Sequence, residues 1–324
     1  MQAIYNIYID NEEIENVGNL SWGDDIETIA SEFSFDSTEN IEIGSKILIA
    51  NAETGKEVLR GILTDKSRNN RNKFSYSGFD YGFYLNKNEV IIQFNNVKID
   101  TAIKQLCAKV NVPCGNICSI NAYVTKIYKD KTVSDIIIEL LEQARKKTGA
   151  KYIFSCQQGK LEVVNTMEKC ETKIELARGH LIPINETLGG ITYTESIQDL
   201  KNAISLVDTQ EKQTFVVASA KDDESIKKFG LLGQIESIDK DDKTSKTIVV
   251  QNLLKDLNKV TVKIGVEMLG SDDFKKGSIL SLDYPEFEIV GDYFATSTKH
   301  SISNRIHHLN AELEKVSWRI QSEN

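Results

Sequence analysis

The sequence predicts an α+β fold that is mainly β, with two antiparallel β-barrel domains and a small inserted α/β domain. Short apolar–polar alternations separated by glycine-containing turns are typical of antiparallel barrels or sandwiches. From about residue 98 the apolar spacing changes to that of helices. A glycine-then-strand pattern appears near both ends of the chain. At roughly 150 residues per domain, 324 residues allow about two domains and an insert.

The first barrel is expected to contain residues 1–97 together with residues 188–222. Apolar and polar residues alternate over residues 5–9, which predicts a strand. Asp24 stands before apolar residues spaced three and four positions apart, which are Ile26, Ile29, Ala30 and Phe33. Because an aspartate can cap a helix and this spacing gives one apolar face, we expect a short helix after Asp24.

An aromatic strand is expected from Phe74 to Tyr84. Two interpretations of its side chains are open. They form barrel core on one face and a subunit contact on the other, or they form a stacking platform for a sugar or single-stranded nucleic acid. The negative charge of the chain favours the first interpretation.

Residues 98–187 are expected to form the inserted domain, with two helices and a β-hairpin. The first helix is capped by Asp100 and ends before Pro113. The second helix, within 132–149, starts with a capping-box pattern and closes with a glycine. The hairpin spans residues 152–163.

Residues 223–324 are expected to form a helix, from about Ser245, and then the C-terminal barrel. In the last strand the apolar positions change from odd to even numbers between Leu313 and Val316. Because side chains alternate with a period of two, this change predicts a β-bulge near residues 314–315.

A short pattern repeats at the two ends of the chain. Gly44-Ser45 and Gly277-Ser278 each precede a strand, and a second glycine opens another strand 14 to 17 residues later. These second glycines are Gly61 and Gly291. If the pattern reflects a duplication, the chain carries two related barrels, one from each end.

The composition argues against several classes of protein. The formal net charge is −9 with no basic block, the opposite of a sequence-independent nucleic-acid binder. Mean hydropathy is −0.31, and no apolar run approaches the roughly 18 residues of a membrane span. The first residues lack the basic flank and apolar stretch of a secretion signal. Membrane, secreted and DNA-coating functions are therefore not expected.

The residues that often carry chemistry do not form a recognised catalytic or metal motif. Cys107, Cys114 and Cys118 lack the paired spacing of structural zinc ligands, so we expect reduced thiols that act as small buried hydrophobes. Residues 50–57 end like a phosphate loop but link two strands, which favours a hairpin turn. Residues 239–242 lack the glycine and glutamate of a calcium loop.

The histidines also argue against a shared metal ion. His307 and His308 are adjacent on an expected strand and therefore point to opposite faces. No catalytic, cofactor-binding or metal-binding residue is predicted.

Several short motifs follow one another along almost the whole chain. They are Trp22-Gly23-Asp24 with Ala30 and Phe33-Ser34-Phe35, Tyr76 with Asp80-Tyr81 and residues 84–87, residues 148–152 with 159–161, Gln198 to Ala203, residues 228–232, and His300 with His308. This ordered series resembles the baseplate hub proteins of contractile phage tails and tailocins. More narrowly, it is similar to the PBSX-type prophage hubs, which are related to the late control protein D group.

The resemblance implies a structural protein without enzymatic activity. It implies a homotrimeric, pseudo-six-fold ring with two barrels per subunit that joins a three-fold central spike to a six-fold tail tube. Further implied partners are a tube-initiator protein, baseplate wedge proteins and the tape-measure protein, with no membrane and no sequence-specific nucleic-acid binding. Assembly is expected in the bacterial cytoplasm, and the final location in the baseplate of a virion or tailocin. The aromatic strand and the C-terminal strands are expected to contribute to the subunit interface.

Two functions of other classes are alternatives. One is a soluble, β-rich module that binds carbohydrate or protein. The other is a cell-wall hydrolase with an unrecognised pair of carboxylates among the 48 acidic residues. Glycan binding by the purified chain would favour the first alternative, and peptidoglycan clearing would favour the second.

Overall fold

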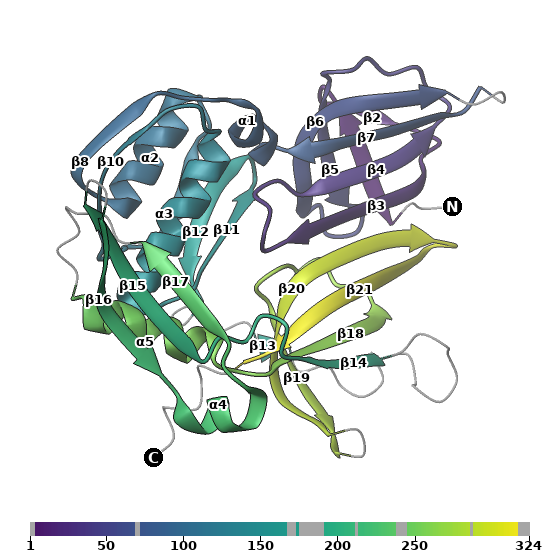
Figure 1. Cartoon of the computed structure of the whole chain (residues 1–324). Helices are drawn as coiled ribbons and strands as arrows, with labels where there is room; N and C mark the ends of the chain where they lie inside the picture. Colours follow the sequence, from purple (N-terminus) through teal and green to yellow (C-terminus); the bar gives the residue numbers. More distant parts are fainter. Residues whose placement is uncertain are drawn as a thin grey trace.

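Strands dominate the structure (Figure 1), and in many of them buried side chains alternate with more exposed ones. The computed structural model describes residues 4–68, 72–166, 173–174, 191–210, 213–237, 245–285 and 288–316. Within these residues, thirteen strands form one sheet, and five helices and eight further strands complete the chain. The protein is therefore mainly β with few helices, which confirms that part of the predicted fold class.

The N-terminal part of the chain contributes seven strands to the large sheet. They are β1 (Tyr5–Ile9), β2 (Glu12–Ile14), β3 (Gly18–Asp25), β4 (Glu32–Ser37), β5 (Lys46–Asn51), β6 (Glu57–Arg68) and β7 (Phe74–Asp80). They lie side by side in the order β3-β4-β7-β6-β5-β1-β2. Phe35 and Tyr76 stack in the core of this sheet with ring centroids 5.3 Å apart. One face of β7 is thus core, as predicted, but the strand ends at Asp80 and a helix begins at Gly82, so the predicted extension of the strand to Tyr84 is wrong.

The C-terminal part contributes the other six strands. They are β13 (Lys173–Ile174), β14 (Ile191–Ser196), β18 (Thr261–Leu269), β19 (Ile279–Tyr284), β20 (Ile289–Ser303) and β21 (Ile306–Lys315). Five of them lie in the order β14-β18-β21-β20-β19, and β13 pairs with β19. This group buries its own core, which includes Ile264, Tyr293 and Leu313.

The long strand β20 joins the two groups of strands. Its first half pairs with β19, and Ser297–Ser301 pair with Ser21–Asp25 of β3. Among the described residues, the path of paired strands begins at β14 and ends at β2, so neither group closes on itself. The prediction of two closed barrels is therefore not confirmed, and the described strands form one open sheet with two cores.

An α/β unit lies between the two groups in sequence and covers one end of the N-terminal strands (Figure 1). Its elements are α1 (Gly82–Lys87), β8 (Ile92–Lys98), α2 (Ile99–Lys109), β9 (Cys114–Ile117), β10 (Tyr123–Tyr128), α3 (Val133–Thr148), β11 (Tyr152–Gln157) and β12 (Lys160–Asn165). Helix α3 begins and ends as predicted. Thr132 Oγ1 accepts a hydrogen bond from Asp135 N, and Gly149 takes the left-handed conformation at φ +72°.

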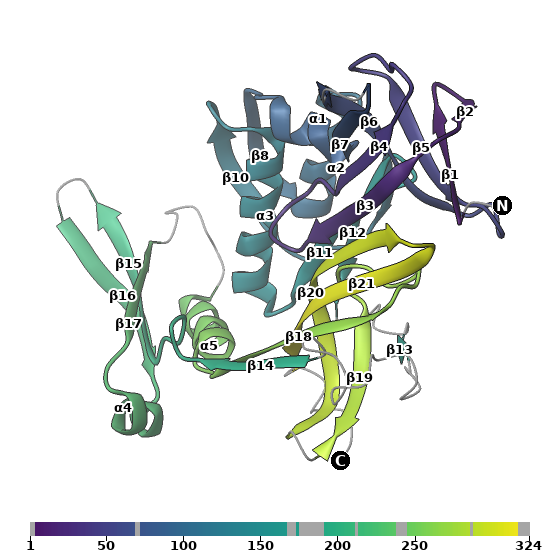
Figure 2. The ribbon, with the colours of Figure 1, turned by 90° about the vertical axis from the view of Figure 1, so that its right-hand side faces the viewer.

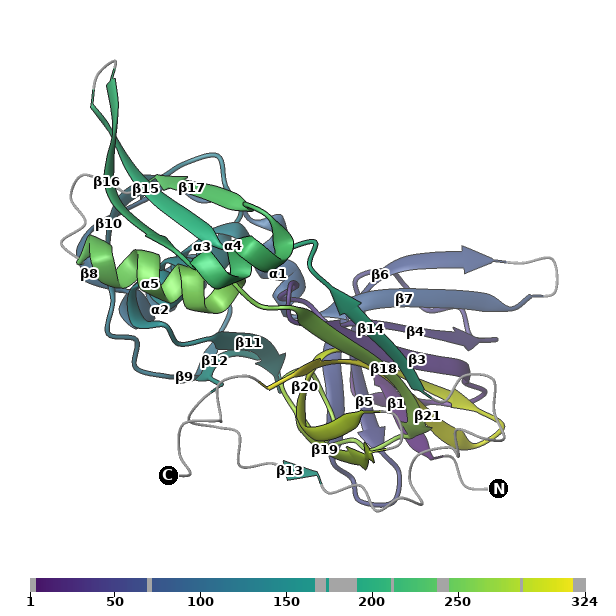
Figure 3. The ribbon, with the colours of Figure 1, turned by 60° about the horizontal axis from the view of Figure 1, so that its bottom comes forward.

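A smaller unit stands apart from the large sheet, and its helix α5 lies between its strands and that sheet (Figure 2). It consists of β15 (Ala203–Gln210), β16 (Gln213–Lys221), α4 (Asp223–Phe229), β17 (Gly233–Ser237) and α5 (Lys246–Leu257). The three strands pair in the order β16-β15-β17, and apolar residues of α5 pack on one face. The unit lies between β14 and β18 in sequence and is far from most of the N-terminal strands (Figure 3).

The strands within residues 188–222 pair differently from the predicted grouping with residues 1–97. Strand β14 pairs with β18, while β15 pairs with β16 and β17. Their alternation resembled that of the first strands, but alternation alone does not identify the partner of a strand. The division of the whole chain into three domains stays a prediction.

Two local predictions about helices are wrong, and one helix was missed. The segment after Asp24 is a turn instead of a helix, because Phe33 belongs to β4 and Asp25 Oδ1 accepts a turn hydrogen bond from Glu27 N at 2.7 Å. Asp100 lies in the first turn of α2, and the N-cap position is Lys98. Helix α4 was not predicted, although Asp222 caps it by accepting from two backbone N–H groups.

Candidate assembly interface

The two groups of strands have the same connectivity. One group has the order β3-β4-β7-β6-β5 and the other has the order β14-β18-β21-β20-β19, and all neighbouring strands are antiparallel. Their members also follow the same order along the chain, so that β3 corresponds to β14, β4 to β18, and β5, β6 and β7 to β19, β20 and β21. The chain therefore contains two copies of a five-stranded arrangement.

Backbone contacts match between the two copies. Gly44 and Gly277, with φ of +91° and +86°, stand just before β5 and β19. The N–H of Gly44 donates to the carbonyl of Leu63 at 2.9 Å, and that of Gly277 donates to the carbonyl of Ala295 at 2.9 Å. In return, Leu63 and Ala295 donate to the serine that follows each glycine, at 3.0 and 2.8 Å. The repeated glycine–serine pair in the sequence thus marks the same turn in both copies.

A bulge also occurs at the same place in both copies. The pairing of β6 with β7 and that of β20 with β21 shift register at Thr64 and Thr296 respectively. The hydroxyl of Thr64 donates to the carbonyl of Ser77 at 3.5 Å, and that of Thr296 donates to the carbonyl of Glu312 at 3.1 Å. The bulge predicted near residues 314–315 is therefore wrong in position, because the extra residue lies in the neighbouring strand β20.

The seam where β3 meets β20 is filled by stacked rings. Trp22 and His300 lie opposite each other and stack with centroids 4.9 Å apart at 6°. His300 Nδ1 lies 2.9 Å from His307 Nε2, and His307 Nδ1 lies 2.9 Å from the hydroxyl of Tyr5. That hydroxyl donates to Asp272 Oδ1 at 2.5 Å. The rings thus connect the first strand of the protein to the last.

The hydrogen bonds of this seam assign the protons of the two imidazoles. Because the Tyr5 hydroxyl gives its proton to Asp272, its oxygen accepts from His307 Nδ1–H, and His307 Nε2 then accepts from His300 Nδ1–H. Burial lowers the pKa of His300 to about 3 and also lowers the pKa of His307. Both histidines of the seam are therefore uncharged at neutral pH.

A buried lysine ties the two copies to the α/β unit. Lys276 Nζ donates to the backbone carbonyls of Asp25 and Thr28 at 2.9 and 2.7 Å, and it lies 5.4 Å from the ring centroid of Phe154. Its backbone N–H donates to the carboxylate of Asp24. Burial lowers the pKa of Lys276 and raises that of Asp24, and the opposite charge of each partner opposes the shift. This pair fixes the turn after β3 against the segment before β19.

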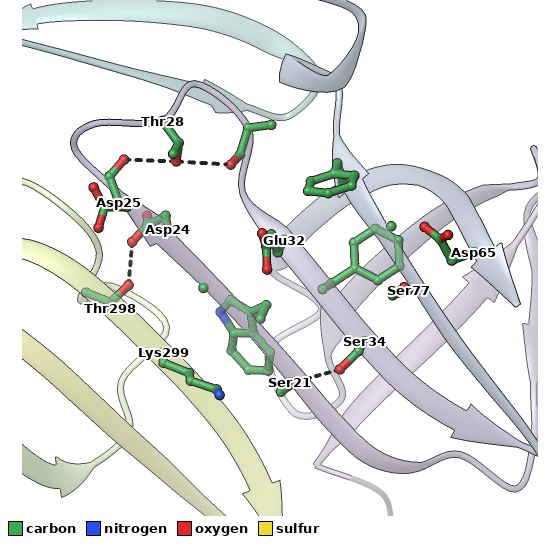
Figure 4. Close-up of a pocket in the computed structure, with 16 residues that line it drawn as sticks. Ser21, Asp24, Asp25, Thr28, Glu32, Ser34, Asp65, Ser77, Thr298 and Lys299 are labelled. Atoms are coloured by element: carbon green, nitrogen blue, oxygen red, sulfur yellow. Dashed lines mark hydrogen bonds between the residues drawn. The ribbon is translucent and has the colours of Figure 1, made fainter. Parts of the chain in front are cut away.

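An acidic groove of about 470 Å³ runs along the outer side of the seam (Figure 4). Strands β3, β4 and β7 form its floor, and its charged lining side chains are those of Asp24, Asp25, Glu32, Asp65 and Lys299. Across it, Ser21 and Ser34 share a hydrogen bond of 2.8 Å. Most charged side chains that line the groove are therefore acidic, and they lie beside the aromatic rings of Trp22, Phe33 and Phe79.

The sequence motifs that were predicted to lack catalytic roles have structural ones. Residues 50–57 form the turn between β5 and β6, where Asn51 Oδ1 accepts from Glu53 N and Thr54 N at 3.0 Å each. This geometry confirms a hairpin turn. The acidic segment at residues 239–242 lies outside the described residues.

The cysteine prediction agrees with the core of the α/β unit. Cys107 is fully buried there, while Cys114 and Cys118 are partly buried and pack against it. Four cysteines are described, all as free thiols, and Cys170 lies outside the described residues. The described residues contain no group of three His, Cys, Asp or Glu side chains arranged to hold a metal ion. In the same residues, no helix is long and apolar enough to cross a membrane.

Sequence reasoning missed the stacked seam and the buried lysine. Both bring together residues more than 240 positions apart, such as Asp24 and Lys276. The repeated Gly-Ser pattern was the available signal for the duplication, but it does not say that β3 and β20 pair.

Solved structures share this fold. The 43 kDa tail protein of prophage MuSo2 from Shewanella oneidensis is 11% identical with a TM-score of 0.71, covering 95% of this chain and 97% of that one. The E. coli c3393 protein, described as a component of the type VI secretion system similar to T4 tail proteins gp27 and gp5, has 10% identity and a TM-score of 0.59. That match covers 97% of this chain and 77% of the other. The fold is thus one that also occurs in phage tail proteins and in a type VI secretion component.

Sequence relatives define the family. The YqbQ-like family model matches residues 20–314, and the chain belongs to this family. The uncharacterized protein YqbQ of Bacillus subtilis is 26% identical over 260 residues, which cover 78% of this chain and 76% of the relative. The phage-like element PBSX protein XkdQ of the same organism is 24% identical over 258 residues, with the same coverage of both chains.

Proposed function

We propose that this protein is a structural baseplate hub of a contractile phage tail or tailocin. In this proposal three copies form a ring that joins a three-fold central spike to a six-fold tail tube. The duplicated five-stranded arrangement carries the proposal, because three chains with two equivalent sheets each present six similar units. A three-fold partner can bind features that only one of the two sheets in each chain has. A six-fold partner can bind features that both sheets share.

The relatives support this role. XkdQ belongs to a phage-like element, and solved structures with the same fold are described as tail proteins. Within a closed ring, each open sheet would be completed by its neighbours, which would restore the barrel character expected from the sequence. In this proposal the protein is analogous to the PBSX-type hubs and to the late control protein D group.

In this role the protein would act mechanically, without residues for catalysis, cofactor binding or metal binding. Its partners would be the central spike, the tail tube or tube-initiator protein, and the baseplate wedge and tape-measure proteins. Neither a membrane nor a specific nucleic-acid sequence is a proposed partner. The protein would assemble in the bacterial cytoplasm and remain in the baseplate.

The native mass of the purified chain tests the ring. Light scattering across a concentration series should give a species near three times the chain mass of 36.4 kDa. A monomer at every concentration, also in the presence of the neighbouring spike protein, would overturn the proposal. Specific glycan binding or peptidoglycan clearing by such a monomer would then favour a binding module or a hydrolase.

A further inference from the structure

We propose that neighbouring subunits in the ring are joined by antiparallel pairing between β14 of one subunit and residues 65–68 of β6 in the next subunit. This inference rests on the proposed ring and specifies the contact that closes it. The argument uses the internal duplication, because one seam of this type already exists inside the chain, between β3 and β20.

The duplication fixes the partner strands. Strand β3 corresponds to β14, and β20 corresponds to β6. In the chain, the second half of β20 pairs with β3 after its first half has paired with β19. The equivalent second half of β6 extends beyond its pairing with β5, which ends at Ile62. If the six units of a ring are arranged alike, this half of β6 pairs with a β14 from another copy.

Both proposed partners have an open side. Strand β14 is the end strand of the sheet, and among the described strands it pairs with β18 alone. Beyond Leu63, the described residues of β6 pair with β7 on one side and with no described strand on the other. Unpaired backbone groups along a strand are a template for pairing with another chain. A closed cyclic assembly would leave neither edge open.

The duplication also fixes the register. Ala295 corresponds to Leu63 through the shared turn, so Ser297 and His300 correspond to Asp65 and Arg68. On the other side, Trp22 pairs with Phe33 of β4, and Tyr193 pairs with Ile264 of β18. Phe33 and Ile264 are equivalent because they oppose Gly78 and Leu313, the partners of Leu63 and Ala295. Trp22 therefore corresponds to Tyr193.

Transferring the internal register gives four cross-strand pairs between copies. Ser297 opposite Asp25, Thr298 opposite Asp24, Lys299 opposite Gly23 and His300 opposite Trp22 are the internal pairs. The corresponding pairs between copies are Asp65 with Ser196, Lys66 with Glu195, Ser67 with Thr194, and Arg68 with Tyr193.

The side chains of these pairs are complementary. Lys66, whose ammonium group donates to Asn40 Oδ1 and to the carbonyl of Ile41 within the chain, would form an ion pair with Glu195, where the internal seam has the Thr298–Asp24 hydrogen bond. Arg68, which donates to Asn72 and lies over the Phe74 ring within the chain, would place its cation on the Tyr193 ring, where the internal seam stacks His300 on Trp22. The complementarity was not used to derive the register, so it supports the register independently.

The exposure of the two aromatic residues agrees with this difference. Trp22 is 8% exposed in its completed seam, whereas Tyr193 is 41% exposed on β14. The hydroxyl of Tyr193 donates to Glu195 at 2.7 Å, so the two side chains lie together on one face of β14. Pairing with β6 would cover this ring in the way that β20 covers Trp22.

Cysteine cross-linking in the full-length protein tests the register. Asp65→Cys with Ser196→Cys should give disulfide-linked dimers and trimers under mild oxidation. The matched control, Asp65→Cys with Thr192→Cys, keeps the same strand face but separates the cysteines by four positions, or about 13 Å along the strand. This distance is beyond the roughly 7 Å that a disulfide spans, so the control should not cross-link. The single variants report the background from native cysteines.

A charge exchange tests the ion pair. Lys66→Glu or Glu195→Lys alone should weaken trimer formation at least about tenfold, and the double exchange should restore it to within about threefold. Glu12→Lys, on the distant β2, serves as the charge control. Thermal unfolding of each variant identifies any change that comes from a misfolded monomer, and the cross-linking result stands without this second test.

The outcomes separate this inference from the proposed function. Trimers with register-specific cross-links support both. Trimers without cross-links, or with equal cross-linking in the Thr192→Cys control, overturn the β14–β6 pairing and leave the hub in place. A monomer at all concentrations, with no cross-links, overturns the ring and the pairing together.

Discussion

His300 links the seam between the two sheets to the pH dependence of stability. Its pKa is about 3 in the folded protein and about 6.5 in an unfolded chain. Between these values the unfolded chain binds a proton that the folded chain does not. The free energy of unfolding should therefore fall as the pH is lowered from 6.5 towards 3, by up to about 1.4 kcal/mol per pH unit from this group.

Replacement of this histidine should flatten the pH profile. In urea unfolding at several pH values, His300→Gln should lose this contribution between pH 6.5 and 4, because glutamine does not titrate. His308→Gln is the control, since His308 lies on the opposite face of β21 from His307. An unchanged acid slope in the His300→Gln protein would contradict the assignment of the effect to the seam.

Lys276 should be among the residues most sensitive to substitution. Lys276→Met would leave the buried carboxylate of Asp24 without its cation and two carbonyls without a donor. Removing one partner of a buried pair costs about 3–5 kcal/mol, which denaturant unfolding would measure. As a control, Lys255→Met on the exposed side of α5 should change stability by less than about 0.5 kcal/mol.

A second substitution distinguishes the charge from the packing. Asp24→Asn combined with Lys276→Met should cost less than the sum of the single changes, because no unpaired charge is left. Strict additivity would contradict the proposed coupling.

At the level of single elements, the capping box of α3 gives a quantitative expectation. Thr132→Ala removes the side-chain acceptor for Asp135 N and should lower the free energy of unfolding by about 1 kcal/mol. Thr132→Ser keeps the hydroxyl and should behave like the wild type. Equal losses for both variants would assign the effect to the methyl group instead of the cap.

Elements were predictable from the sequence where local chemistry determines them. Helix α3 has a capping box, an apolar stripe and a left-handed glycine within 18 residues, and its limits were correct. The helix predicted after Asp24 does not form. The apolar residues of this segment are buried by distant elements, and their helical spacing is coincidental. The bulge was misplaced because Val316, which still donates to the carbonyl of Asp292 in β20, packs in a different core from Leu313, so the change of parity marks a change of buried face.

The interface was less predictable than the elements. The aromatic strand and the repeated glycine–serine pair were visible in the sequence. The pairing of β3 with β20 joins residues that are 272 to 280 positions apart, and no local pattern specifies such a partner. Lys276 gave no signal either, because a single lysine in a polar segment is normally exposed.

At the scale of the whole molecule, the smaller unit that includes β15–β17 and α5 should be removable. The chain leaves the large sheet after Ser196, forms this unit and returns to the sheet at Thr261. Ser196 and Thr261 are cross-strand partners. In the other copy, residues 26–31 make the corresponding connection between β3 and β4. We expect a chain in which residues 197–260 are replaced by a turn of that length to fold and to keep its oligomeric state.

Size-exclusion chromatography with light scattering would measure this outcome. Some loss of stability is expected, because α5 packs against α3 and Lys146 contacts Glu236 at 2.6 Å. The Lys146→Met protein, which lacks that contact alone, is the control for this loss. Aggregation of the shortened chain, with a stable Lys146→Met protein, would show that the unit is required for folding.

The β3–β20 seam also affects how quickly such a ring could form. If six similar units had to meet as separate chains, every contact would depend on a collision in solution. Here half of the contacts link units on one polypeptide, where the effective concentration of one unit around the other is far above that of free protein. Only two encounters between molecules then need to occur before the ring closes on itself, so closed rings would form at lower protein concentration and with fewer incomplete intermediates.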